Sequence, residues 1–217
     1  MRLADYIGKF WAGAEVMYGV IIAMTFTSIL RGFPVVLELV LNKVILAALF
    51  CCIAWGIADG MFYLWERNYL IRRENKTIEF SKSSRQESAV SLIGEQLDDT
   101  ILRNIPVENR LQLYEKLTQF LSTVHEREKL TPRQAVTIVL GTFLLSAGAG
   151  LVIVFPFFII DNVKQALIVS NLSGIFLLFI IGYSRAFERN FLSRIILGTG
   201  SAFIGIIIAG ITIVLGG

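Results

Sequence analysis

Cysteine, histidine and proline are scarce in this chain of 217 residues, which holds two Cys, one His and four Pro. The two cysteines, Cys51 and Cys52, are adjacent, so they cannot form a disulfide framework and are best interpreted as small apolar packing residues. The sequence has no P-loop, no nucleophile elbow, no Cys/His zinc spacing and no Glu-x-x-His pair of the di-iron type. We therefore expect no enzyme activity and no resident cofactor. Basic residues are scattered, so nucleic-acid binding is not expected either.

Apolar residues are abundant and gathered into blocks. They make up 55% of the chain, and the mean hydropathy is +0.67. About 20 apolar residues are needed to cross a bilayer as a helix. The blocks of this length are 10–30, 44–65, 135–160, 163–183 and 191–215. None alternates with period two, so the sequence predicts an all-α membrane protein with five transmembrane helices in a two-plus-three layout.

Charge placement predicts the orientation of the chain. Segments 1–9, 66–134 and 184–190, together with Arg194, hold all but three of the 20 Lys and Arg residues. The remaining three are Arg31, Lys43 and Lys164. The positive-inside rule then places the N-terminus in the cytosol and the C-terminus outside. We expect transmembrane helices 1 and 2 in 1–65, a cytosolic insert in 66–134 and transmembrane helices 3 to 5 in 135–217.

The insert between the second and third spans has helical patterns of its own. The segment 66–80 is expected to continue the second span into the cytosol. Apolar residues then recur at helical spacing in two sets. The first set is Ala89, Ile93, Leu97 and Ile101, and the second is Val107, Leu111, Tyr114, Leu117, Leu121 and Val124. The run Asn104-Ile105-Pro106 separates them and predicts a break.

Two carboxylates lie inside predicted spans, where an ionisable group is costly and usually functional. Glu15 is roughly 8 Å from the cytosolic start of the first span at a rise of about 1.5 Å per residue. Asp59 is roughly 9 Å from the cytosolic end of the second span by the same rise. Antiparallel neighbours would bring both to a similar depth, where they would form a cation site with oxygen ligands. Alternatively, they are interfacial acids or form ion pairs with Lys9, Arg67 or a group on the third span.

Further donor atoms lie near these carboxylates in the sequence. They are Met17, Tyr18, Thr25 and Thr27 on the first span and Met61 and Tyr63 on the second. A thioether beside carboxylates would shift the preference from magnesium or calcium towards a softer transition ion. The alternative for Met17 and Met61 is apolar filling.

The second span reads Gly56-Ile57-Ala58-Asp59-Gly60 and continues with Met61-Phe62-Tyr63. This stretch resembles the "GLAD" segment in the second helix of the vacuolar iron transporter family. The first span, 15–27, is similar to that of prokaryotic members, and the two-plus-three layout with a helical insert is also similar. The resemblance implies a homodimer in a prokaryotic cell membrane. It also implies that the protein moves ferrous iron or manganese out of the cytosol in exchange for protons.

By this resemblance, Asp59 matches the aspartate in the family's second helix directly. Other positions differ from the family pattern. Tyr18 stands where the family has a first-helix aspartate, with Glu15 one turn earlier. Tyr63 stands where the family has a methionine four residues after that aspartate. The family's acidic residue near the cytosolic exit has its nearest counterpart in Glu66, at a shifted position. The insert contains no Glu-x-x-Glu pair and no methionine, and its only histidine, His125, is isolated. Its acids are best interpreted as a solvated helix face.

Two functions follow from these observations. The first is a secondary transporter for ferrous iron or manganese. Its metal ligands would be Glu15 and Asp59, with secondary donors at Met17, Tyr18, Met61, Tyr63 and Glu66. The second is a membrane scaffold or partner-binding protein that keeps the fold without transport.

Overall fold

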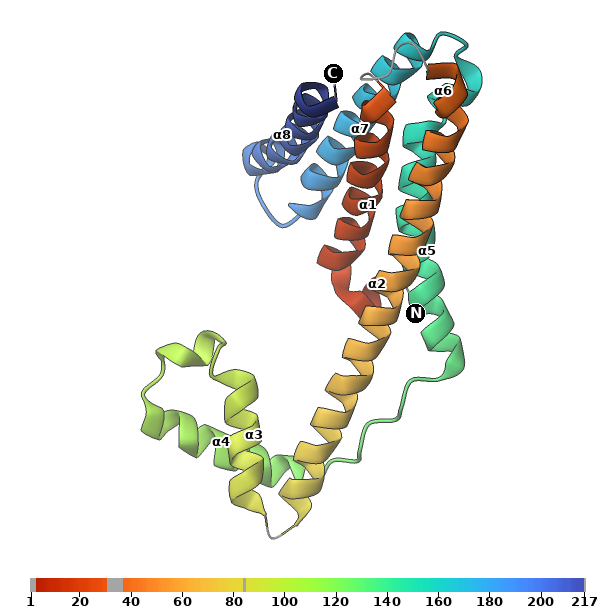
Figure 1. Cartoon of the computed structure of the whole chain (residues 1–217). Coiled ribbons are helices and arrows are strands. Elements are labelled where there is room, and N and C mark those ends of the chain that lie inside the picture. The colour runs from red at the N-terminus through yellow and green to blue at the C-terminus, as the bar shows by residue number, and fades with distance from the viewer. Residues whose placement is uncertain (1–2, 31–36, 84, 217) are drawn as a thin grey trace. The chain divides into compact units, whose positions relative to one another are not determined.

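The computed structural model describes residues 3–30, 37–83 and 85–216, and almost all of them are helical (Figure 1). Five helices are long and apolar enough to cross a membrane. These are α1 (Ala4–Ile29), α2 (Leu37–Lys82), α5 (Pro132–Val154), α7 (Val163–Arg185) and α8 (Phe191–Gly216). The shorter elements are α3 (Gln86–Leu97), the 3-10 helix η2 (Ile101–Asn104), α4 (Val107–Leu121) and α6 (Pro156–Ile159). The predicted all-α fold, with five long apolar helices and shorter helices after the second, is confirmed.

The helices form two compact units. The membrane unit comprises Met1–Leu64 and Pro132–Gly217, and the insert unit comprises Trp65–Thr131. Helix α2 contributes to both units, because it continues without interruption from Leu37 to Lys82. The predicted continuation of the second span through 66–80 is therefore confirmed.

Local chemistry explains where the long helices begin and end. Helix α1 starts at Ala4, earlier than the predicted 10, and is interrupted at Gly8, which has φ 83°. Glycine adopts this left-handed conformation at little cost because it has no Cβ. At the far end of the third span, α5 ends at Val154 and α6 begins at Pro156. Proline ends the helix there because it lacks an N–H and clashes with the preceding turn.

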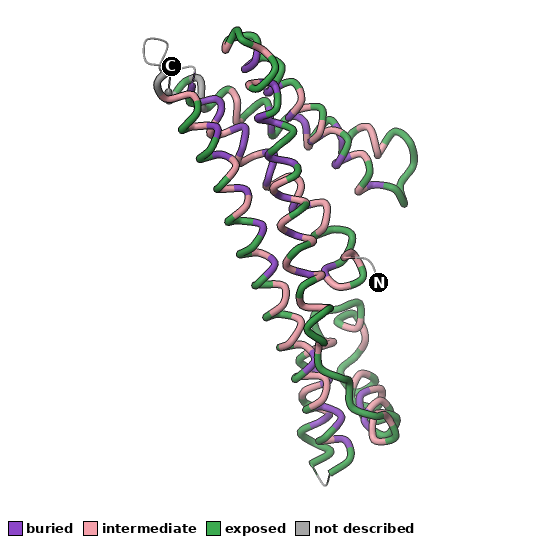
Figure 2. The backbone as a smooth tube through the Cα atoms, turned by 90° about the vertical axis from the view of Figure 1, so that its right-hand side faces the viewer, coloured by how far each residue is buried: buried purple, intermediate pink, exposed green. Residues whose placement is uncertain are grey.

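The core of the membrane unit lies where α1, α2, α5 and α7 meet, and Figure 2 shows buried positions recurring along the long helices. Its buried residues are Val20, Ala23, Met24, Cys52, Ala149, Ile153 and Leu178. In lipid these contacts stabilise mainly through close packing, since lipid tails are as apolar as the side chains. The small residues Ser201 and Gly205 of α8 belong to this packing. They face α7, because a Cβ on Gly205 would lie 2.8 Å from Leu178 Cδ1 and a Cβ on Gly182 would overlap Ser201.

Polar contacts join the helices of the insert unit. The Asp98 Oδ1 atom, just after α3, accepts a hydrogen bond from the Tyr114 hydroxyl at 2.7 Å and pairs with Arg110 Nη1 at 2.6 Å. Desolvation by burial and the hydrogen bond to Asp98 raise the pKa of Tyr114 above its ordinary value. A second salt bridge joins Arg127 to Glu74 at 2.8 Å and ties the segment before α5 to α2.

The predicted insert helices are shorter in the structure than their apolar patterns indicate. Helix α3 ends at Leu97, so Ile101 lies in η2, where 82% of its surface is exposed. Helix α4 ends at Leu121 and excludes Val124. The run Asp98-Asp99-Thr100 explains the first difference, because these side chains favour caps and turns over helix interiors. The Thr100 side chain indeed accepts a hydrogen bond from the Leu102 N–H. The predicted break at 104–106 is confirmed.

Candidate functional site

Glu15 lies at the centre of the candidate site, on the face of α1 that meets α2. The residue is fully buried, with 0% of its surface exposed. Its Oε1 atom accepts a hydrogen bond of 2.8 Å from the Tyr63 hydroxyl on α2. Its Oε2 atom is buried and has no hydrogen-bond partner among the described residues. A carboxylate oxygen at this depth needs a proton or a cation to satisfy it, and Asp59 is the neighbouring acid with which Glu15 can share one.

Asp59 is the second carboxylate of the site and lies one helical turn before Tyr63 on α2. It is partly buried and close enough to Glu15 for the two side chains to interact electrostatically. The structure therefore brings Glu15, Asp59 and Tyr63 together, as the antiparallel arrangement of the first two spans predicts. None of the three takes part in a salt bridge in the described part of the chain, where the salt bridges join Arg110 to Asp98 and Arg127 to Glu74.

Helix α5 holds α1 and α2 in this arrangement through small residues. A Cβ added to Gly56 would lie 2.8 Å from Phe143 Cα, and one added to Gly60 would lie 2.7 Å from Val139 Cα. Across the same interface, the Ser146 hydroxyl donates to the Cys52 carbonyl oxygen at 2.9 Å. Small residues at these positions let the helix backbones approach closely. Gly56 and Gly60 flank Asp59, so the same contacts fix the position of that carboxylate.

The two first-span secondary donors have other contacts. Met17 Sδ accepts a hydrogen bond of 3.2 Å from Arg185 Nη1 at the end of α7. Tyr18 packs edge-on against Trp55, with 6.0 Å between the ring centroids, and also lies close enough to Tyr63 for the two side chains to interact electrostatically. Residues two apart on a helix point in directions about 200° apart, so Met17 faces away from the side of α1 that carries Glu15. Thr25 and Thr27 donate to carbonyl oxygens of their own helix, those of Ile21 and Ala23.

The remaining predicted donors lie outside the Glu15 cluster. Met61 is 53% exposed, and no contact joins it to Glu15 among the described side-chain interactions. Glu66 is exposed and belongs to the insert unit. Their assignment as metal ligands stays a prediction. The described residues contain no group of three or more His, Cys, Asp and Glu side chains arranged to hold a metal ion.

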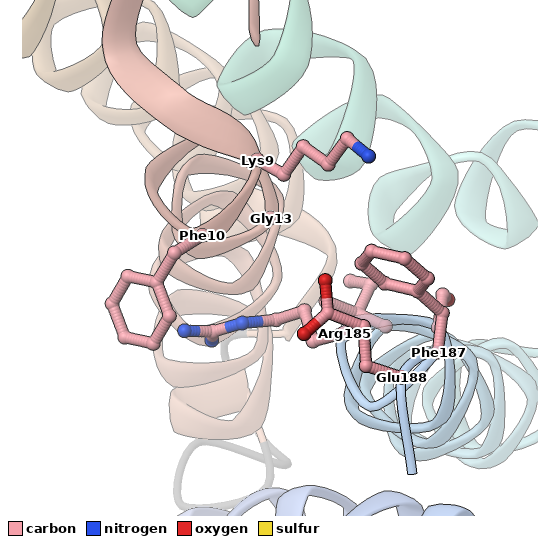
Figure 3. A pocket seen from close by; sticks show the side chains of 8 residues that line it. Lys9, Phe10, Gly13, Arg185, Phe187 and Glu188 are labelled. Carbon is pink, nitrogen blue, oxygen red and sulfur yellow. The ribbon is translucent and has the colours of Figure 1, made fainter.

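The sequence did not single out Arg185. This last residue of α7 lies against the first half of α1 in the structure. Its guanidinium carbon lies 3.8 Å from the centroid of the Phe10 ring, and its side chain packs against Gly13. It also lines a cavity of about 480 Å³ together with Lys9, Phe187 and Glu188 (Figure 3). The sequence offers only one signal for this residue, a basic side chain at the end of a span, which the positive-inside rule already explains.

No protein-family model matches the chain, and no curated protein matches it either. The fold itself defines the class of the protein. Five helices of sufficient length and hydropathy make it an integral, multi-pass helical membrane protein that lies in a lipid bilayer.

Proposed function

We propose that the protein is a secondary transporter that moves a divalent transition metal, ferrous iron or manganese, out of the cytosol in exchange for protons. One observation carries the proposal. A fully buried carboxylate, Glu15, lies beside a second carboxylate, Asp59, inside the membrane unit, and its Oε2 atom accepts no hydrogen bond from the residues that the structure describes.

Electrostatics supports a cation as the cargo. The negative charges of two neighbouring carboxylates repel strongly in a medium of low dielectric constant. The pair is stable only when a proton or a cation neutralises it, and no arginine or lysine forms a salt bridge to it among the described residues. Because a carboxylate must lose its proton to bind a metal, metal binding and proton release are coupled at this pair.

The donor atoms narrow the choice of ion. Glu15 and Asp59 offer carboxylate oxygens, and the Tyr63 hydroxyl adds a third oxygen within hydrogen-bond distance of Glu15. The Met17 sulfur faces Arg185, so a thioether does not join the set from that position. Carboxylate and hydroxyl oxygens suit hard divalent ions such as manganese. We therefore expect manganese to be transported as well as ferrous iron.

The resemblance to vacuolar iron transporters adds the direction of transport and a homodimeric assembly to the proposal. The small residues Ser201 and Gly205 of α8 pack within the chain against α7. We therefore place the contact between protomers elsewhere on the membrane unit.

The test is metal flux into proteoliposomes with an imposed proton gradient, measured for Mn²⁺ and Fe²⁺ with Mg²⁺ as a comparison. Asp59→Asn and Glu15→Gln each keep the shape of the side chain and remove its charge, so we expect flux to fall at least tenfold. Glu87→Gln is the matched control, since Glu87 is an exposed acid of the insert unit. Unchanged manganese and iron flux in Asp59→Asn would refute the transporter.

The alternative is a scaffold that docks a partner through its insert unit. A groove of about 300 Å³ favours it, because apolar residues of α2, α3 and α4 line this groove. The apolar lining residues are Ile78, Ile93, Leu97, Leu117 and Leu121. Growth in excess iron or manganese separates the two functions: a transporter protects the cell, and a scaffold leaves metal sensitivity unchanged.

A further inference from the structure

The cavity at the end of the membrane unit where α1 begins and α7 ends has a chemistry of its own. It has a volume of about 480 Å³ and is lined by Lys9, Phe10 and Gly13 of α1 and by residues from the end of α7 onward, among them Ser184 and Arg185. Figure 3 shows the Arg185 side chain reaching toward the Phe10 ring and the Lys9 side chain ending on the side of Phe187, with Phe187 and Glu188 on the segment that follows α7. A second cavity of about 460 Å³ shares Phe10, Arg185 and Glu188 with it and adds Arg189.

The cationic side chains of this cavity are held by weak acceptors. Lys9 Nζ lies 4.6 Å from the centroid of the Phe187 ring, and Arg185 contacts the Phe10 ring and the Met17 sulfur. Neither forms a salt bridge within the described ranges. A sulfur and two aromatic faces are poorer partners than an anionic oxygen, so both cations keep donors for a stronger one.

The cavity also carries the marks of the membrane boundary. Phe10 and Phe187, which line it, are exposed large aromatic residues. Basic pockets between transmembrane helices bind lipid headgroups where the hydrocarbon core meets the headgroups. A soluble anion would gain nothing from the exposed aromatic rim, whereas a lipid would cover it with its glycerol and upper acyl carbons.

We infer that this cavity binds the headgroup of a membrane phospholipid, with the phosphate held by Lys9 and Arg185. Glu188, the acid that lines both cavities, accepts from an ammonium or hydroxyl group on the same headgroup. Phosphatidylethanolamine and phosphatidylglycerol carry such donors, and phosphatidylcholine does not. The inference is independent of metal transport, because none of these residues belongs to the Glu15 cluster.

The experiment is native mass spectrometry of the full-length protein released from detergent in the presence of equimolar phosphatidylethanolamine, phosphatidylglycerol and phosphatidylcholine. We expect the first two to be retained over the third. Arg185→Gln and Lys9→Gln should each lower their retention about tenfold, the size of one charge-assisted hydrogen bond. Lys9 is exposed, so its variant tests the site even if Arg185→Gln folds poorly. Arg103→Gln, an exposed position of the insert unit, should retain lipid like the unaltered protein.

Two further arms identify the source of the phosphate and the role of the acid. Glu188→Gln should reduce the preference over phosphatidylcholine while leaving phosphate binding in place. Equal retention of the three lipids by the unaltered protein, or unchanged retention in both Lys9→Gln and Arg185→Gln, would overturn the inference. Displacement of bound lipid by millimolar inorganic phosphate alone would also overturn it, since the site would then serve a soluble anion.

Discussion

Glu15 has the highest electrostatic cost of the residues that form the candidate site, because its side chain is fully buried in a helix expected to lie in lipid. The hydrogen bond from Tyr63 offsets part of that cost. It also fixes the direction of the carboxylate, so that within the described part of the chain Oε2 rather than Oε1 has no hydrogen-bond partner. The tyrosine therefore has a positioning role, and the two carboxylates provide the charge.

Replacing Tyr63 by phenylalanine should remove this hydrogen bond without creating a cavity. Interhelical hydrogen bonds in membranes contribute about 0.6 kcal/mol on average, and bonds to charged groups contribute more. We expect a loss of about 1 kcal/mol in the free energy of unfolding, measured by titration with a denaturing detergent in mixed micelles. Tyr69→Phe on the same helix is the control, since Tyr69 is exposed. Equal stability of the two variants would show that the Tyr63 hydroxyl does not support Glu15.

Helix α5 is the element that determines the geometry of the site. It presents Val139, Thr142, Phe143 and Ser146 to the glycines of α2. Since no side chain of α2 separates the backbones at Gly56 and Gly60, Asp59 is held between two points of close contact. A change in this interface should move Asp59 relative to Glu15 even though neither carboxylate is altered.

Gly60→Ala should force α2 and α5 apart, because the new Cβ would lie 2.7 Å from Val139 Cα, a backbone atom that cannot rotate away. Overpacking of this kind costs about 1 to 3 kcal/mol. We expect the free energy of unfolding to fall by that amount and metal flux to fall with it. Gly148→Ala on α5 is the matched control, because a Cβ at Gly148 would have no described atom within 4 Å. If Gly60→Ala and Gly148→Ala have the same free energy of unfolding, then close contact at Gly60 does not position the site.

At the scale of the whole molecule, the number of spans determines which segments share a side of the membrane. One span, α5, separates the segment that ends at Thr131 from the link between α6 and α7. Another, α7, separates that link from the segment before α8. The orientation predicted from basic residues places the first and third of these segments in the cytosol.

Single cysteines in a Cys51→Ala, Cys52→Ala background should report this arrangement. We expect a membrane-impermeant thiol reagent to label Asp161→Cys in intact cells, and to label Lys129→Cys and Arg189→Cys only after permeabilisation. All three positions are exposed, so a lack of labelling reflects the side of the membrane. Labelling of Lys129→Cys and Asp161→Cys from the same side would contradict the assignment of α5 as a span.

Particular residues show how much was predictable. The spans, the helical continuation past Trp65 and the break before Pro106 follow from apolar runs, helical spacing and proline chemistry, all of which act over a few residues. The proximity of Glu15 to Asp59 was predicted from depth in antiparallel neighbours. The contact between Met17 and Arg185 was not predictable, because it joins residues 168 positions apart whose spacing carries no pattern.

The local chemistry of the chain was sufficient to establish a five-span helical membrane protein with two acids at membrane depth, since a stretch of about 20 apolar residues has no other stable form in lipid. The packing of the helices determined which faces of α1 meet α2 and α7. That choice depends on close approach between glycines and small side chains far apart in the chain, so it left Glu15 beside Tyr63 and turned Met17 towards Arg185.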